Sequence, residues 1–284
     1  MKKIKLAIVG VTGVVGRTVL KVLEEKKLPI DEYIMFASAR SAGSKIKFME
    51  KEYTVRELTE HSFDEHIDYA IFSAGGDTSK KYSPIASEHG CIVVDNSSAF
   101  RMDENVPLVV PEVNPEEIEN NHGIIANPNC STIQAVVALK PLDDKYKIKR
   151  IVYSTYQAVS GAGRYGVEDL ENGVEHYKKQ KDEFDNINIA GSSEYKLKKF
   201  PHPIFNNCLP HIDVFTENGY TKEEMKMINE TRKILKHPEL PITATTARVP
   251  IFNSHCESIN VEFEKDFELK ELIETLKQFE GIIV

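Results

Sequence analysis

Three glycines recur at every third position near the start of the chain, at Gly10, Gly13 and Gly16. They follow an apolar, β-branched run at 5–10 and open a segment at 14–27 whose apolar residues have helical periodicity. A glycine turn between strand and helix lets the backbone approach a pyrophosphate, and the helix N-terminus supplies free N–H groups. The spacing is GxxGxxG and not the usual GxGxxG. It still predicts a dinucleotide-binding βα unit, with a tight turn that holds no ligand as the alternative.

The first half of the chain alternates between short apolar runs and helical segments. After the first run, four more occur at 33–38, 68–73, 91–95 and 123–127. Short apolar runs bounded by turn residues are typical of strands buried on both faces. Helical segments between them indicate βαβ units and a parallel sheet.

The pattern changes after about Pro141. Residues 149–157 and 243–249 are rich in β-branched or alternating positions, and 257–263 alternates apolar with polar residues, which predicts a strand with one exposed face. We therefore expect an α/β protein. A Rossmann-like, doubly wound parallel-sheet domain at 1–129 precedes an α+β domain with a mixed sheet at 130–284.

One helix of the second half has clear end signals. Thr221 and Glu224 have the spacing of a capping box, and Pro238 lies just beyond the predicted end near Lys236. A final helix is predicted at about 269–280.

Charge and cysteine content narrow the partners and the compartment. The 284 residues carry a formal net charge of −8, which disfavours nucleic acid as a partner. No apolar run approaches the ~20 residues that span a bilayer, and no signal-peptide cleavage site follows the first run. We therefore expect a cytoplasmic protein whose four cysteines stay reduced. None of them forms a CxxC pair, so we expect no metal site.

The end of the second apolar run indicates which nicotinamide cofactor would bind. An NAD enzyme typically places an acid there for the ribose hydroxyls, but this segment has none. Arg40 stands there between Ser38 and Ser41, and a guanidinium pairs well with a phosphate. The segment favours NADP, and an ordinary exposed loop cation is the alternative.

Cys130 is the candidate nucleophile. It joins the fifth apolar run to an apolar helix, where the free N–H groups and the dipole favour a thiolate. The carboxyl end of a parallel strand is also where open α/β sheets bind ligands. The alternative, a small buried hydrophobe, suits Cys91 within an apolar run better.

A thiol nucleophile needs a proton partner, and nine histidines are available. Spacing alone makes His255 a modest favourite, because it stands at the head of a predicted strand, seven residues after Arg248. Most of the others fall in polar, loop-like stretches.

Several separate motifs, in order along the chain, resemble those of aspartate-β-semialdehyde dehydrogenases, in the branch found in many Gram-positive bacteria. The motifs are GVTGVVGR at 10–17, SAGG at 73–76, DNSSAFRM at 95–102, VVPEVN at 109–114, NPNCST at 127–132, YQAVSGAG at 156–163, EEMK at 223–226 and RVP at 248–250. The resemblance runs from Lys3 to about Phe263.

The resemblance implies a reaction and a set of site residues. NADPH would reduce L-aspartyl-4-phosphate to L-aspartate 4-semialdehyde, with release of phosphate, on the route to lysine, threonine and methionine. Cys130 would be the nucleophile, His255 the general acid/base and Gln157 the residue that orients the acyl intermediate. Glu223 and Arg248 would hold the substrate's amino and carboxylate groups, and the phosphate would be held by Arg101, Asn129 and Lys226. The implied cofactor-binding residues are Gly10, Thr12, Gly13, Val14, Val15, Gly16, Ser38, Arg40, Ser41, Ser73, Gly75, Ser160, Gly161 and Gly163.

The residue types suit this chemistry. A thiolate attacks the acyl carbon, phosphate leaves, and the thioester accepts hydride more readily than a carboxylate does. Without the resemblance, Glu223 and Lys226 would be read as an ordinary helical surface pair, and Arg248 as an exposed strand cation.

The resemblance also implies a homodimer or homotetramer built on the second domain. Relatives run on by several dozen residues past Val284, as a strand and helix that return to the first domain, so this chain is expected to lack that C-terminal segment. Two other functions stay open. N-acetyl-γ-glutamyl-phosphate reductase shares the architecture, but has a glycine where Asn129 stands here. A catalytically silent NADP-binding protein would have no reason to retain Cys130, Gln157, Arg248 and His255 together.

Overall fold

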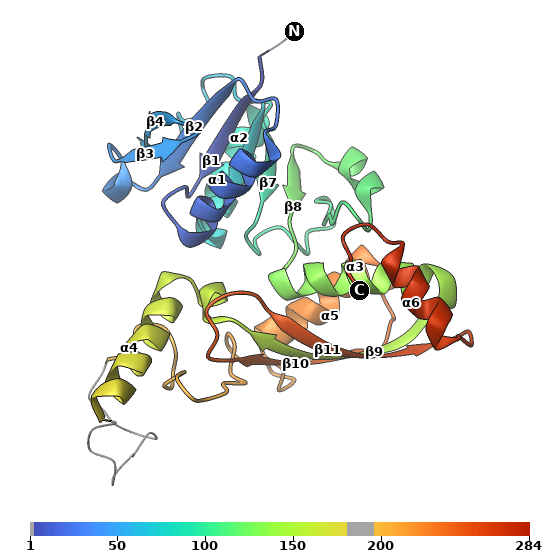
Figure 1. The fold of residues 1–284 in the computed structure, drawn as a ribbon. Helices are drawn as coiled ribbons and strands as arrows, with labels where there is room; N and C mark the ends of the chain where they lie inside the picture. Colours follow the sequence, from blue (N-terminus) through green and yellow to red (C-terminus); the bar gives the residue numbers. More distant parts are fainter. Residues whose placement is uncertain (1–2, 181–195) are drawn as a thin grey trace. The chain divides into compact units, whose positions relative to one another are not determined.

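A computed structural model describes residues 3–180 and 196–284. Contacts divide the chain into two units (Figure 1). Unit 1 comprises Met1–Asn129 with Lys233–Lys236, and unit 2 comprises Cys130–Arg232 with His237–Val284. A helix that begins in unit 2 thus ends among the residues of unit 1.

Unit 1 is built on a six-stranded sheet in the order β5-β2-β1-β6-β7-β8, in which all neighbours are parallel. Its strands are β1 (Lys5–Val9), β2 (Glu32–Ala37), β5 (Arg56–Glu57), β6 (Tyr69–Phe72), β7 (Ile92–Asp95) and β8 (Ile124–Ala126). The predicted parallel sheet and Rossmann-like fold are confirmed. The short apolar runs form its strands because both faces of the sheet are covered.

Two core clusters fill the faces of this sheet. One gathers around Ile8 and Met35, and the other around Val9, Phe36 and Phe72, and all five side chains are almost fully buried. Successive residues of β1 and β2 thus enter opposite clusters, as the period-2 geometry of a strand requires. Burying each such side chain stabilises the fold by roughly 1.5–3 kcal/mol.

The helical elements of unit 1 follow its strands. They are α1 (Val14–Lys26), η1 (Ala39–Ser41), α2 (Gly76–Glu88) and η2 (Pro115–Asn120). Lys27, at the end of α1, adopts the left-handed conformation that stops the helix. A hairpin of β3 (Lys45–Phe48) and β4 (Lys51–Thr54) was not predicted.

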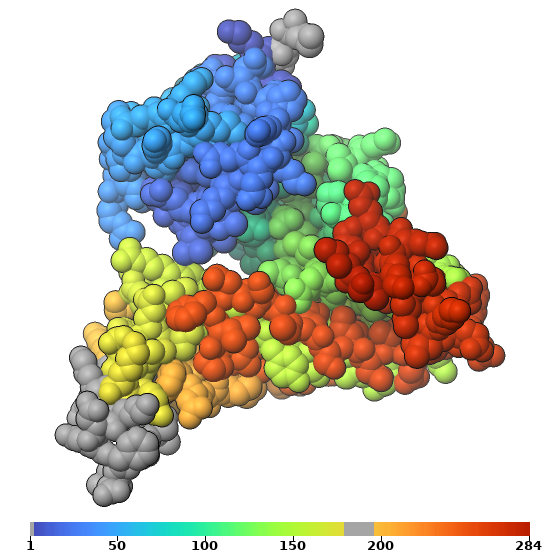
Figure 2. All heavy atoms as spheres, in the orientation of Figure 1, coloured from blue at the N-terminus to red at the C-terminus, as the bar shows by residue number. Residues whose placement is uncertain are grey.

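Unit 2 is built on a three-stranded mixed sheet in the order β10-β9-β11. The central strand β9 (Ile148–Gln157) pairs in parallel with β10 (Ile242–Arg248) and antiparallel with β11 (Cys256–Phe263). Along β11 half-buried and exposed residues alternate, so the predicted strand with one exposed face is confirmed. In Figure 2 the orange and red atoms of β11 and the last helix lie on the visible face of this unit.

Helices α3 (Cys130–Tyr146) and α5 (Lys222–Ile234) pack on one face of this sheet. On that face the buried Tyr153 hydroxyl of β9 lies 3.0 Å from the Thr231 hydroxyl of α5. The predicted capping box of α5 is confirmed. Thr221 donates its N–H to Glu224 Oε2 at 2.7 Å and accepts one from Glu224 at Oγ1.

The other helical elements of unit 2 are η3 (Val159–Ala162), α4 (Arg164–Gln180) and α6 (Leu269–Lys277). The last helix is therefore three residues shorter than predicted, and it packs on α3. Helix α4 was not predicted. In the described part of the chain, no helix is long and apolar enough to cross a membrane.

Candidate active site

Cys130 is the first residue of α3, and its exposed Sγ lies 3.2 Å from Nε2 of His255. The two residues are 125 positions apart in the sequence. The fold joins them because β11, which begins directly after His255, packs against α3. A thiol at a helix N-terminus with an imidazole at this distance is the arrangement that nucleophilic catalysis by cysteine requires.

The backbone fixes the tautomer of His255. Ala158 donates its N–H to His255 Nδ1 at 2.9 Å, so Nδ1 is an acceptor and the ring proton resides on Nε2, which faces Cys130. Burial and the nearby Arg248 charge lower the pKa of His255 below its usual value. The imidazole is therefore a neutral ring that points a proton at the sulfur.

Gly161 leaves little room for a side chain beside His255 and Arg248. A Cβ there would lie 3.0 Å from Arg248 Nη1 and 3.3 Å from His255 Nε2. The backbone of η3 thus closes tightly over the two side chains.

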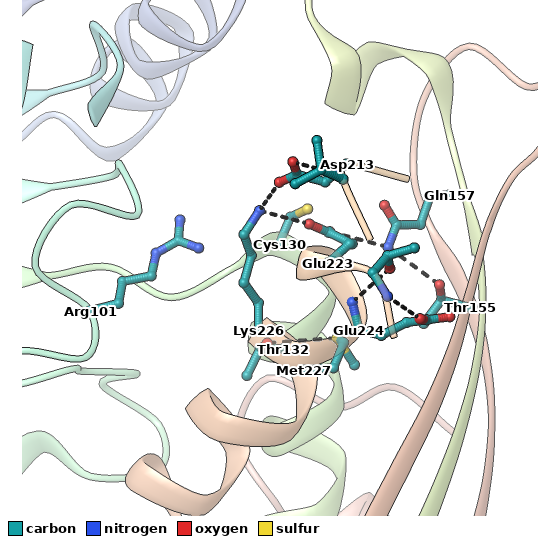
Figure 3. A network of polar contacts seen from close by, with 12 residues as sticks. Arg101, Cys130, Thr132, Thr155, Gln157, Asp213, Glu223, Glu224, Lys226 and Met227 are labelled. Carbon is teal, nitrogen blue, oxygen red and sulfur yellow. Dashed lines mark hydrogen bonds and ion pairs between the residues drawn. The ribbon is translucent and has the colours of Figure 1, made fainter. Parts of the chain in front are cut away.

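Four polar side chains form a network next to Cys130 (Figure 3). The Gln157 amide donates to Glu223 Oε1 at 3.3 Å. Lys226 donates to Glu223 Oε2 and to Asp213 Oδ2, each at 3.1 Å. Burial acts to lower the pKa of Lys226, but the charges of Glu223 and Asp213 outweigh it and the net shift is upward. Lys226 is therefore a cation here, and Glu223 is a buried carboxylate beside it.

Arg248 adds a second cation at the end of β10. It is only 6% exposed, and its Nη1 donates to the Ala158 carbonyl oxygen at 2.7 Å. Its buried Nε has no hydrogen-bond partner among the described residues. Burial lowers the pKa of Arg248, and the charges of Glu223 and Cys130 oppose that shift. A buried guanidinium with an unused donor is suited to binding an anionic group of a ligand.

Sheet register gathers these residues at one end of unit 2. Gln157, the last residue of β9, pairs with Arg248, the last residue of β10. On the other side of β9, Tyr156 pairs with Cys256, which directly follows His255. The Gln157 amide, the Arg248 guanidinium and the His255 imidazole therefore lie at the same end of the three strands.

Two of the predicted substrate residues belong to unit 1. Arg101 is buried and donates through Nε to the Asn127 carbonyl at 2.9 Å and through Nη2 to the Asn96 carbonyl at 3.1 Å. Asn129 is also buried. Within unit 2 the structure brings together Cys130, Gln157, Glu223, Lys226, Arg248 and His255.

The glycine turn of unit 1 fits a dinucleotide phosphate. Gly10 has φ +87°, and a Cβ there would lie 2.4 Å from the Ser73 carbonyl oxygen. A Cβ on Gly16 would lie 2.3 Å from the Gly10 carbonyl oxygen. No side chain caps the start of α1, which begins at the exposed Val14 and Val15, so its first N–H groups remain suited to an anion.

The remaining predicted cofactor residues lie in two turns of unit 1 and at η3 of unit 2, where some are exposed and others, such as Ser73 and Ser160, are half-buried. Thr12 and Gly13 lie in the β1–α1 turn, and Ser73 and Gly75 lie in the turn from β6 to α2. No side chain caps α2, whose N-cap is Gly75 with φ +91°. Ser160 and Gly161 lie in η3 and Gly163 ends it, in unit 2.

Arg40 lies in η1 directly beyond β2. It is exposed, as is Ser38, and it forms no ion pair within the described residues. Ser41 donates its N–H to the Ser38 carbonyl at 2.8 Å, so both hydroxyl residues flank Arg40 in one tight turn. A guanidinium presented in this way suits a 2′-phosphate.

Sequence reasoning did not identify two contributors to the site. Asp213 is the second carboxylate on Lys226, and Ala158 orients His255 and Arg248 through its backbone. A backbone group has no sequence signal. Asp213 lies 13 residues from Lys226, in a segment without regular structure.

This chain is similar to known proteins over nearly its whole length. A family model described as "semialdehyde dehydrogenase, NAD binding domain" matches residues 5–121, and one described as "semialdehyde dehydrogenase, dimerisation domain" matches residues 139–284. The aspartate-semialdehyde dehydrogenase of Aquifex aeolicus is 53% identical over 282 residues, which are 99% of this chain and 80% of that protein.

Solved structures of this kind are also similar. The aspartate semialdehyde dehydrogenase II of Vibrio cholerae, complexed with ASA, has a TM-score of 0.91 and 43% identity, over 99% of this chain and 80% of that one. An aspartate semialdehyde dehydrogenase from Candida albicans with NADP has a TM-score of 0.72 and 25% identity, over 98% and 77%.

Proposed function

Because this chain belongs to the aspartate-semialdehyde dehydrogenase family, we propose that it reduces L-aspartyl-4-phosphate to L-aspartate 4-semialdehyde with NADPH, through a thioester on Cys130. The observation that carries this proposal is the Cys130–His255 pair at 3.2 Å beside two cations and a buried carboxylate. The step belongs to the biosynthesis of lysine, threonine and methionine.

Cys130 Sγ attacks the acyl carbon, and phosphate leaves as the thioester forms. His255 holds its proton on Nε2, where it first faces the sulfur and then the oxygen that becomes negative in the tetrahedral adducts. Hydrogen-bond donors aimed at developing charge are a large part of catalysis by such sites. Collapse of the reduced adduct releases the aldehyde and returns the thiolate.

The charges of the site match a zwitterionic substrate that carries phosphate. Arg248 binds the α-carboxylate and Glu223 binds the α-ammonium, while Gln157, held by Glu223 and Thr155, orients the acyl group. Arg101, Asn129 and Lys226 bind the phosphate. A buried unused donor on Arg248 and a buried carboxylate on Glu223 both support this assignment.

The nicotinamide supplies the hydride that reduces the acyl carbon. The β1–α1 turn at 10–16 holds the pyrophosphate through backbone N–H groups, together with Ser73 and Gly75. Arg40, Ser38 and Ser41 hold the 2′-phosphate, which makes NADP the cofactor. The loop with Ser160, Gly161 and Gly163 completes the cofactor site.

Residues 1–129 act as the NADP-binding domain, and residues 130–284 act as the catalytic and dimerisation domain. The match of residues 139–284 to a dimerisation domain supports a homodimer or a homotetramer. We also propose that the protein acts in the cytoplasm.

The test is phosphate-dependent oxidation of aldehydes with NADP or NAD. We expect turnover of L-aspartate 4-semialdehyde with NADP, and little with N-acetyl-glutamate semialdehyde. Preference for the second aldehyde would identify the related reductase instead. Tight NADP binding with no turnover of either aldehyde would identify a silent binding protein.

A further inference from the structure

Lys233, near the C-terminal end of α5, binds three backbone carbonyl groups of one loop. Its Nζ donates to the carbonyl oxygens of Arg101 at 2.9 Å, Asp103 at 2.7 Å and Val106 at 2.9 Å. An ammonium group has three N–H donors, and this loop supplies an acceptor for each of them. All four residues belong to unit 1.

The loop that Lys233 binds, residues 101–106, includes Arg101 itself. Two backbone turns shape it, from Asp103 N–H to the Phe100 carbonyl and from Val106 N–H to the Asp103 carbonyl. The Arg101 side chain is held separately, by the carbonyl groups of Asn96 and Asn127. The ammonium therefore fixes the backbone from which the guanidinium extends.

We propose that Lys233 is a positioning residue for the phosphate subsite, acting through Arg101. This inference rests on the proposed phosphate-binding role of Arg101. Lys233 itself donates its N–H groups to the loop carbonyl groups and does not bind substrate. The charge-assisted bonds of Arg101 to phosphate depend on where its guanidinium lies, so loosening the loop beneath it should weaken phosphate binding measurably.

Lys236 provides a matched control. It lies one turn beyond Lys233 in the same part of unit 1, and it pairs with Glu116 at 2.9 Å and Glu117 at 2.6 Å. Those partners lie in η2 and not in the Arg101 loop. Removing either lysine costs one positive charge at the same end of α5, but only Lys233 holds the loop.

The experiment measures phosphate-dependent oxidation of L-aspartate 4-semialdehyde by the full chain. Lys233→Met should raise the KM for inorganic phosphate on the order of tenfold, as expected when a charge-assisted bond to phosphate is weakened. The kcat and the KM for NADP should change less than about twofold, and Lys236→Met should leave all three unchanged. Lys233→Arg, which keeps the charge and N–H donors, should retain most of the phosphate affinity and tests the inference if the Met variant does not fold.

The double variant Arg101→Ala/Lys233→Met decides whether Lys233 acts through Arg101. We expect the second substitution to add less than about twofold to the phosphate KM of Arg101→Ala. Fully multiplicative effects, or a phosphate KM unchanged in Lys233→Met, would overturn the inference and leave the proposed function intact. An unchanged phosphate KM in Arg101→Ala alone would instead refute the role proposed for Arg101.

Discussion

The backbone N–H of Ala158 lies 2.9 Å from Nδ1 of His255 and donates to it, which leaves Nε2 as the protonated nitrogen of the ring. Burial and Arg248 lower the pKa of this imidazole, so it should remain neutral at pH values where an ordinary histidine is half protonated. Nitrogen-15 NMR of the histidine ring should report the Nε2–H tautomer and a titration midpoint below 6.5. A midpoint at or above 6.5, or the Nδ1–H tautomer, would contradict this arrangement.

Substitution of the nucleophile should separate chemistry from cofactor binding. Cys130→Ala should lower turnover by several decades, because no other group supplies the thiolate, while NADP binding stays nearly unchanged. Iodoacetamide should label Cys130 before the exposed Cys208 and Cys256, with Cys208→Ala as the active control. An active Cys130→Ala enzyme would refute the mechanism.

A methyl group at Gly161 should damage the site without unfolding the protein. Its Cβ would approach Arg248 Nη1 to 3.0 Å and the His255 ring to 3.3 Å, and both side chains are held by Ala158. We expect Gly161→Ala to lower kcat/KM at least tenfold, since small displacements of catalytic groups are costly. The melting temperature should change little. Unaltered kinetics would mean that the two side chains move aside freely.

Arg40 should determine the preference between the two nicotinamide cofactors. Arg40→Ala removes a charge-assisted bond of about 1.5–3 kcal/mol to a phosphate that NAD lacks. The preference for NADP should therefore fall roughly ten- to hundredfold in titrations of both cofactors. Lys21→Ala, which removes an exposed cation of α1, controls for net charge. Equal losses for NADP and NAD in Arg40→Ala would show that Arg40 only supports its loop.

Glu257 should make stability depend on pH. Burial raises its pKa to about 7, against the opposing hydrogen bonds of Gln134 and Ser131. Between about pH 5 and 7 the folded protein therefore binds a proton that the unfolded chain releases, so this contribution to stability is lost as pH rises through 7. Denaturant unfolding should show the advantage of wild type over Glu257→Gln falling by about 1–2 kcal/mol from pH 5 to 8, after allowance for partial exposure. If the difference in unfolding free energy between wild type and Glu257→Gln does not depend on pH, the Glu257 carboxyl is more exposed to solvent than the structure shows.

Much of the fold was predictable because its signals are local. The apolar runs of the first half and the capping box at Thr221 each report a structure formed by neighbouring residues. The β3–β4 hairpin gave no such signal. Its turn residues Met49 and Glu50 both have positive φ. Two-residue turns of this kind usually contain Asn-Gly, and this turn does not. Helix α4 contains Gly166 and Gly173, which weaken any helical pattern.

The site was predictable in part. Cys130 could be identified from its turn and helix, whereas spacing alone made His255 only a modest favourite. Asp213 and the Ala158 backbone could not be found from sequence. They act through contacts set by the β9–β10 register and by a left-handed backbone at Asp213, and neither property is encoded locally.

The separation of 125 positions between Cys130 and His255 has a consequence for synthesis on the ribosome. At about 5–20 residues per second, the thiol is made roughly 6–25 s before the imidazole that serves it. The last partner arrives with β11, which must pair with a strand made about a hundred residues earlier. A nascent chain therefore carries Cys130 without its imidazole partner until β11 has been made and pairs with β9, so the reactive pair forms only when this sheet is complete.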